Sequence, residues 1–71
     1  MPRLPNLNAR KILRLLEKHG FAVDHVTGSH YVLYHARNNR RVTVPHHSGN
    51  LPKGTTASIF KQAGLSAEDV A

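Results

Sequence analysis

The first part of the chain arranges apolar and polar residues with the period of a helix. Within residues 8–20, "NARKILRLLEKHG", apolar side chains recur at positions i, i+3, i+4 and i+7: Ala9, Ile12, Leu13 and Leu16. This is the spacing of one face of an α-helix. Asn8 is a residue type that caps helix N-termini, and Gly20 suits the left-handed conformation that follows many helix ends. The pattern therefore predicts a helix between these two residues.

From Phe21 onward the period changes to that of strands. Three segments rich in β-branched and aromatic residues are separated by turn-forming residues: "FAVDHVT", "HYVLYHA" and "RRVTV". In the third segment Val42 and Val44 alternate with polar residues, so the predicted antiparallel sheet buries one face and exposes the other. In the middle segment both alternating sets mix apolar with polar residues. The pattern therefore does not assign its buried face.

A second helix is predicted after the loop that follows Pro45. Around "TTASIFKQAG", Thr55 or Thr56 lies near the expected start and Gly64 at the expected end. The residues expected to face the sheet are Ile59, Phe60 and Ala63. In "SAEDV", Ser66 and Asp69 have the spacing of a capping box, which predicts one further helical turn.

These elements predict a two-layer α+β fold in the order α-β-β-β-α. The 71 residues form one domain, residues 1–71, of which residues 1–7 are an extended lead-in. A chain of this length has only a thin core. Both helices must therefore cover the same face of the three-stranded antiparallel sheet to bury their apolar sides.

The net charge of the chain limits the classes of partner that it is expected to bind. Ten Lys and Arg against four Asp and Glu give a net charge of +6, which favours nucleic acid, an anionic membrane or an acidic protein. The chain has no cysteine, which excludes disulfides and thiolate zinc sites. No apolar run approaches the roughly 18 residues of a membrane span, and the first residues have no apolar core of a secretion signal. The expected location is therefore the cytoplasm, with no membrane partner.

Three sequence blocks carry a resemblance to a known family. In their order and spacing, "GSHYVLYH", "RRVTVPHH" and "LPKGT" followed by "IFKQAGL" resemble the HicA toxins of type II toxin-antitoxin pairs, over nearly the whole chain. The resemblance implies a fold similar to double-stranded RNA-binding domains, an endoribonuclease acting on mRNA (an mRNA interferase), and inhibition by a HicB-like antitoxin. It also implies that the histidine after Gly-Ser, His30, is catalytic. The lead-in and the doubled histidine at 46 and 47 are less typical, and His47 aligns better with the single histidine of the family.

The chemistry of RNA cleavage fits these residue types. When the 2′-hydroxyl of RNA is the nucleophile, cleavage needs a base, an acid and positive charge, and it needs no metal or other cofactor. A histidine serves as base or acid near neutral pH. Six residues are candidates for RNA contacts: Gly28, Ser29, Arg41, His47, Lys53 and Gly54. Gly28 permits close approach of the substrate, Ser29 offers a hydroxyl or amide to a phosphate oxygen, and Lys53 stands at the start of the second helix, where amide N–H groups attract phosphate.

Other functions remain open from the sequence. A transition metal held by the histidines is disfavoured, because no Asp, Glu or Cys lies near the adjacent pair at 46 and 47, so we expect no metal site. A non-catalytic RNA- or DNA-binding module of the same fold explains the positive charge equally well, as does an adaptor for an acidic protein. The alternative for His30 is a half-exposed strand histidine that has no function. Only the enzyme accounts for a histidine that follows a Gly-Ser turn.

Overall fold

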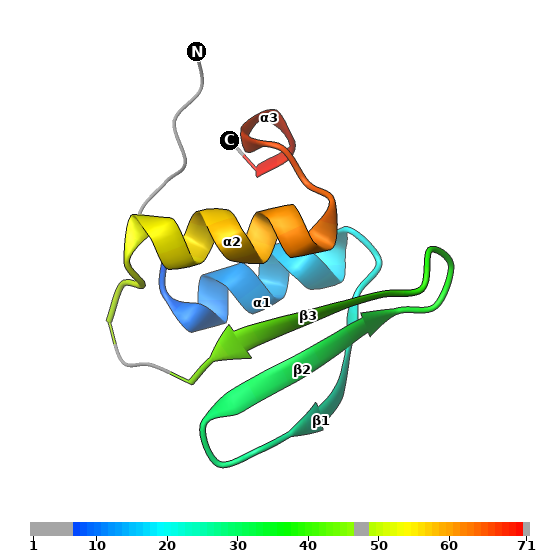
Figure 1. Ribbon diagram of the computed structural model, residues 1–71, viewed down its shortest axis with the longest axis horizontal. Helices are drawn as coiled ribbons and strands as arrows, with labels where there is room; N and C mark the ends of the chain where they lie inside the picture. The colour runs from blue at the N-terminus through cyan, green and yellow to red at the C-terminus, as the bar shows by residue number, and fades with distance from the viewer. Residues whose placement is uncertain (1–6, 47–48, 71) are drawn as a thin grey trace.

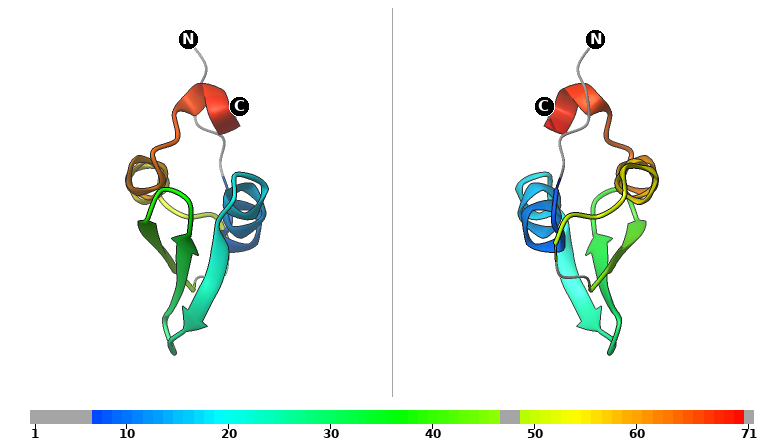
Figure 2. Two further views of the ribbon diagram at one scale, coloured as in Figure 1. Left: turned by 90° about the vertical axis from the view of Figure 1, so that its right-hand side faces the viewer. Right: turned by 90° about the vertical axis from the view of Figure 1, so that its left-hand side faces the viewer.

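The predicted architecture is confirmed in the computed structural model, which describes residues 7–46 and 49–70. The elements are α1 (Ala9–Lys18), β1 (Ala22–Val26), β2 (His30–His35), β3 (Arg40–Pro45), α2 (Lys53–Ala63) and α3 (Ala67–Val70). The strands form an antiparallel sheet in the order β1-β2-β3. Figures 1 and 2 show α1 and α2 side by side over one face of this sheet, with the other face free. The fold is thus a two-layer α+β domain.

Helix α1 begins and ends where its sequence pattern predicts. The Asn8 side-chain oxygen accepts a hydrogen bond from the Lys11 backbone N–H at 2.9 Å, which satisfies one free N–H of the first turn. Gly20, just after the helix, has a φ of 97°. This left-handed conformation is one that a residue with a Cβ adopts at a cost, so glycine here turns the chain from the helix into β1.

The strand register assigns the buried face of β2, which the sequence pattern left open. Leu33 pairs with Val42 and Tyr31 pairs with Val44, and these residues face the helices. His30 pairs with Pro45 on the opposite, outer face. The register therefore presents His30 on the side of the sheet that the helices do not cover.

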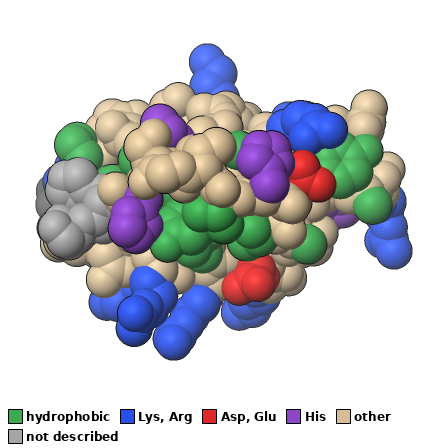
Figure 3. All heavy atoms as spheres, turned by 90° about the horizontal axis from the view of Figure 1, so that it is seen from below, with side chains coloured by type: hydrophobic (Ala, Val, Ile, Leu, Met, Phe, Trp, Pro, Cys, Tyr) green, Lys and Arg blue, Asp and Glu red, His purple; other side chains and the backbone are tan. Residues whose placement is uncertain are grey.

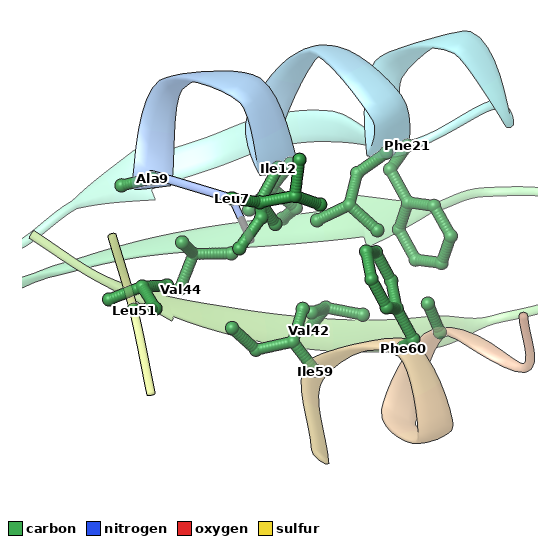
Figure 4. Close-up of a cluster of buried hydrophobic side chains, with 12 residues drawn as sticks. Leu7, Ala9, Ile12, Phe21, Val42, Val44, Leu51, Ile59 and Phe60 are labelled. Atoms are coloured by element: carbon green, nitrogen blue, oxygen red, sulfur yellow. The ribbon is translucent and has the colours of Figure 1, made fainter. Parts of the chain in front are cut away.

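The core fills the space between the two helices and the sheet. Figure 4 shows apolar side chains from α1, β3 and α2 pointing toward one another in this layer. Its fully buried members include Ile12, Leu16, Leu33, Val42, Val44, Ile59 and Phe60. Leu7, which the sequence places in the lead-in, is also part of this core. Its carbonyl oxygen accepts a hydrogen bond from the Leu51 backbone N–H at 2.9 Å, so this end of the lead-in and the β3–α2 loop are joined.

The start of α2 agrees with the sequence prediction, which places Lys53 at the start of this helix and Thr55 or Thr56 near it. The helix begins at Lys53, after Pro52, and no side chain caps its first N–H groups. Thr56 is the fourth helical residue, and its side chain is buried against the core. Pro52 suits this start, because the fixed φ of proline fits the position before or within a first helical turn. The end of α2 is as predicted, with Gly64 at a φ of 74°.

The last predicted turn is α3, and the capping residues behave as the sequence indicated. The Asp69 carboxylate accepts hydrogen bonds from the Ser66 backbone N–H at 2.8 Å and from the Ser66 hydroxyl at 3.0 Å. The backbone hydrogen bond, followed by the hydroxyl, holds the pKa of Asp69 below its ordinary value, because both stabilise the ionised carboxylate. The element order therefore ends with a capped turn after α2.

Candidate functional site

His30 opens β2 directly after the tight turn that joins β1 to β2. The Thr27 backbone N–H donates to the His30 carbonyl oxygen at 2.8 Å, and the Thr27 hydroxyl oxygen accepts from the His30 backbone N–H at 2.9 Å. The same hydroxyl donates to the His30 carbonyl at 3.1 Å. Thr27 thereby fixes the backbone of His30 through its side chain as well as its main chain. Residues 28 and 29 form the exposed tip of this hairpin.

The imidazole of His30 is held by the neighbouring serine. The Ser29 hydroxyl oxygen lies 2.9 Å from His30 Nδ1, within hydrogen-bond distance. A hydrogen bond at Nδ1 fixes the ring orientation, which leaves Nε2 as the nitrogen that can meet another molecule. The sequence assigned the Ser29 hydroxyl or backbone N–H to a phosphate oxygen. In the structure this hydroxyl is engaged with the histidine ring.

A groove of about 350 Å³ lies between β3 and α2, and His30 is part of its wall. The remaining lining residues are Thr43, Pro45, Gly54, Thr55, Ser58, Ile59 and Gln62. Four of these side chains carry a hydroxyl or an amide, and two are apolar. Among the described residues that line the groove, His30 has the sole ionisable side chain.

The N-terminus of α2 forms one end of this groove. Gly54 lines the groove, and a Cβ built at this position would meet nothing within 4 Å, so the backbone here is open to an approaching molecule. Lys53, the first residue of the helix, is exposed beside it. The first-turn N–H groups and the lysine charge together favour an anion. The structure thus brings His30 and Gly54 together on one groove and sets Lys53 at its end.

Arg41 and Gly28 are placed differently. Arg41 lies on the outer sheet face, with its guanidinium carbon 4.9 Å from the centre of the Tyr34 ring and a terminal nitrogen 3.7 Å from the Asp24 carboxylate. It does not line the groove. The His25 ring donates to the same carboxylate at 2.8 Å, and this hydrogen bond holds the pKa of Asp24 below its ordinary value. Gly28 lies at the hairpin tip, where a built Cβ meets nothing within 4 Å.

The other histidines of the described segments lie away from the groove. The His35 ring packs edge-on against Phe21, with ring centres 5.0 Å apart, and its Nδ1 accepts from the Asn38 backbone N–H at 3.3 Å. The His46 ring packs against Tyr31 at 5.4 Å, beside α1. Its backbone N–H donates to the Ser29 carbonyl at 2.8 Å, which joins the end of β3 to the hairpin tip. His47, a candidate from the sequence, lies outside the described residues.

Sequence reasoning missed part of the groove. Thr43 was identified only as an exposed strand residue, and Ser58 and Gln62 were not considered. Yet Gly54, Ser58 and Gln62 are four residues apart, a spacing that places all three on one side of a helix. The sequence could have indicated the groove through this row of residues, which runs beside the apolar side of the same helix.

Figure 3 shows the molecule from below relative to Figure 1. Apolar side chains occupy the middle of this surface, histidines lie around them, and Lys and Arg side chains gather along its border. Over residues 7–46 and 49–70, no helix is long and apolar enough to cross a membrane, and no three His, Asp or Glu side chains come together as a potential metal site.

Comparison with known families agrees with this arrangement. A family model described as the HicA toxin of bacterial toxin-antitoxin systems matches residues 9–65 of the 71-residue chain. The chain belongs to the HicA toxin family. The matched region of this HicA toxin includes the hairpin of His30 and every residue of the groove. Membership makes the chain a toxin of a toxin-antitoxin system and implies an antitoxin partner. No curated protein matches this HicA toxin.

Proposed function

We propose that this HicA toxin is a metal-independent endoribonuclease that cleaves mRNA in the cytoplasm, with His30 as the general acid/base and without a cofactor. One observation carries the proposal. An exposed imidazole is held at Nδ1 by Ser29 on the wall of a groove whose end is a helix N-terminus. A proton-transfer group and an anion-binding end therefore face the same space, as cleavage of a phosphodiester requires.

The proposed reaction uses the RNA's own nucleophile. The 2′-oxygen attacks the adjacent phosphorus, the bond from phosphorus to the 5′-oxygen breaks, and a 2′,3′-cyclic phosphate and a 5′-hydroxyl result. Nε2 of His30 takes the proton from the 2′-hydroxyl or gives one to the leaving 5′-oxygen. Either transfer lowers the barrier, because a positioned acid or base removes charge that the transition state would otherwise carry.

The proposed RNA contacts surround this step. Lys53 and the backbone of Gly54 hold the scissile phosphate at the α2 N-terminus, where charge and helix dipole add. The open tip at Gly28 lets the RNA approach His30 closely, and Ser29 contributes by holding the ring. We place Arg41 and His47 on neighbouring phosphates of the RNA.

A second candidate is a non-catalytic RNA- or DNA-binding module. It is favoured by one observation, that His30 has no ionisable partner among the residues that line the groove. An enzyme of this design needs water, or the RNA itself, to supply the second proton transfer. The binding module needs neither.

The antitoxin is proposed to be a HicB-like protein with an acidic contact surface that covers His30 or the strip around Lys53. An uninhibited ribonuclease would destroy the messages of its own cell. Opposite charge speeds the capture of a toxin with a net charge of +6. A complex that left both regions open to RNA would contradict this arrangement.

The decisive experiment compares the wild type with His30→Ala on end-labelled RNA. The change removes an exposed side chain, so we expect a folded protein and a fall in cleavage rate of roughly 100-fold or more. His25→Ala is the matched control, because His25 is an exposed strand histidine that does not line the groove and should leave the rate nearly unchanged. If wild type and His30→Ala bind RNA equally and neither cleaves it, the binding module is the correct function.

A further inference from the structure

The polar side of α2 lines a part of the groove that lies beyond His30 and the proposed phosphate site. Gly54, Ser58 and Gln62 follow one another at four-residue steps along the helix and all line the groove. Eight residues of helix span about 12 Å. His30 is paired with Pro45, so it lies toward the end of β3, whereas Gln62 lies beside Thr43, further back along that strand. The groove therefore continues past the proposed cleavage point.

The groups at this far end are of the kind that recognise a nucleobase. Gln62 carries an amide with one acceptor and two donor positions, and Ser58 carries a hydroxyl that does both. Pro45, which is half-buried, adds apolar surface to the same lining, against which a flat ring can pack. A volume of about 350 Å³ lies within the range of small-ligand sites.

The present partners of Gln62 are easily replaced. Its Oε1 accepts from the Thr43 backbone N–H at 3.4 Å, and its Nε2 donates to the Ser58 hydroxyl at 3.4 Å. Both distances lie beyond the usual range for hydrogen bonds from N–H to oxygen. The side chain is also exposed. A base edge with complementary groups can therefore exchange these long contacts for shorter ones.

We propose that the groove between β3 and α2 binds one nucleobase next to the scissile phosphate, and that Gln62 and Ser58 read its edge and give the toxin a cleavage-site preference. The inference rests on the proposed ribonuclease function and names its specificity site. Pro45 contributes affinity for any base, whereas the amide and hydroxyl distinguish one base from another.

The test maps cleavage sites on an RNA pool with a randomised segment. The variants are Gln62→Ala, Gln62→Glu and Ser58→Ala. Gln62→Glu keeps an oxygen for the Thr43 N–H and loses the amide donors, so it separates base reading from the role of Gln62 in joining α2 to β3. Lys61→Ala is the control on the same helix, because Lys61 is exposed and does not line the groove.

We expect the wild type to prefer one base at a single position beside the cleaved bond by about 5- to 150-fold, the discrimination typical of a good pair of hydrogen bonds to a base edge. Gln62→Ala and Gln62→Glu should reduce or change this preference, and Ser58→Ala should weaken it. Lys61→Ala should alter the rate at all sites equally. A wild type that cleaves without base preference, or a Gln62→Glu profile identical to the wild type, would overturn the inference and leave the ribonuclease intact.

A binding measurement separates the two proposals. Affinities of the wild type for short oligonucleotides that differ at one base, with 2′-deoxy sugars to prevent cleavage, do not depend on catalysis. Base-dependent affinity that Gln62→Glu removes, in a protein that cleaves nothing, would retain the base site and reject the ribonuclease. Absence of both cleavage and base-dependent affinity would reject both.

Discussion

At the scale of single residues, the turn before β2 determines what His30 can do. The Gly-Ser-His sequence indicates an exposed histidine after a turn, and this much could be predicted from residue types. The hydroxyls of Thr27 and Ser29 both bond to His30, one to its backbone and one to its ring. These bonds depend on side-chain directions around a closed turn, which the order of residue types does not specify. The phosphate contact expected of the Ser29 hydroxyl is thus joined by a positioning role.

Replacing Ser29 with Ala tests this positioning role. Without the hydrogen bond at Nδ1 the ring of His30 samples other orientations, so we expect kcat to fall about 10-fold while KM changes little. Ser29→Thr keeps a hydroxyl and should restore most of the rate. Steady-state cleavage kinetics give both constants, and ¹⁵N NMR of the ring shows whether the hydrogen bond at Nδ1 is lost. If Ser29→Ala instead raised KM at unchanged kcat, the hydroxyl would be a substrate contact, as the sequence first indicated.

At the scale of elements, the sequence predicts most of the fold because apolar spacing and glycines mark the helices. Asn8, Gly20 and Gly64 stand at the predicted ends of α1 and α2. The buried face of β2 could not be assigned, because His35 shares the inner face with Leu33 and packs on Phe21. A histidine counts as a polar residue in a sequence pattern, but in the structure the ring of His35 packs like an aromatic side chain. The groove was missed for a related reason, since its wall combines residues of β2 and β3 with residues of α2, which lie far from them in sequence.

The same substitution should have different effects on stability at two glycines that lie beside strand ends. Gly20 has a φ of 97°, and a Cβ there would overlap the ring of His35. Gly20→Ala should therefore lower the free energy of unfolding by about 1–3 kcal/mol. At Gly28 a Cβ meets nothing within 4 Å, so Gly28→Ala should change stability by less than about 0.5 kcal/mol. Urea denaturation compares the two.

The same pair of variants separates folding from substrate approach. If the open tip at Gly28 serves the RNA, Gly28→Ala should reduce cleavage although the protein is fully stable. In contrast, Gly20→Ala should retain the wild-type rate at temperatures where it is folded. Equal losses of stability in both variants would contradict the assignment of the left-handed conformation to Gly20 and not to Gly28.

At the scale of the whole molecule, charge and shape act together. The helices occupy one side of a thin sheet, so the opposite side remains open to a large partner (Figures 2 and 3). The groove between β3 and α2 adds to this open surface. The net charge of +6 draws polyanions to any part of this surface. Charge alone does not select RNA over an acidic antitoxin, and the two are expected to compete for the same face. Under the proposed function we expect this selection to come from the groove, where hydroxyls and the imidazole lie near Lys53.

The last prediction concerns this balance of charge and chemistry. RNA binding should weaken steeply as salt rises, because each phosphate neutralised by Lys or Arg releases counterions and adds about 0.7 to the slope of log affinity against log salt for a single strand. Lys53→Ala should reduce the slope by about this amount. Lys11→Ala, an exposed α1 lysine that does not line the groove, should leave it unchanged. Filter binding to labelled RNA at several salt concentrations measures the slopes.

Cleavage by the same protein at constant salt should survive EDTA, because a histidine and the 2′-hydroxyl supply the chemistry without a metal. EDTA tests whether cleavage needs a metal, and the salt series tests whether phosphate contacts provide the affinity. The two experiments therefore test separate parts of the mechanism. Cleavage that EDTA abolished and zinc restored would show that the reaction needs a metal and would reject the metal-free mechanism. A salt slope near zero would reject phosphate contacts as the source of affinity, whatever the chelator did.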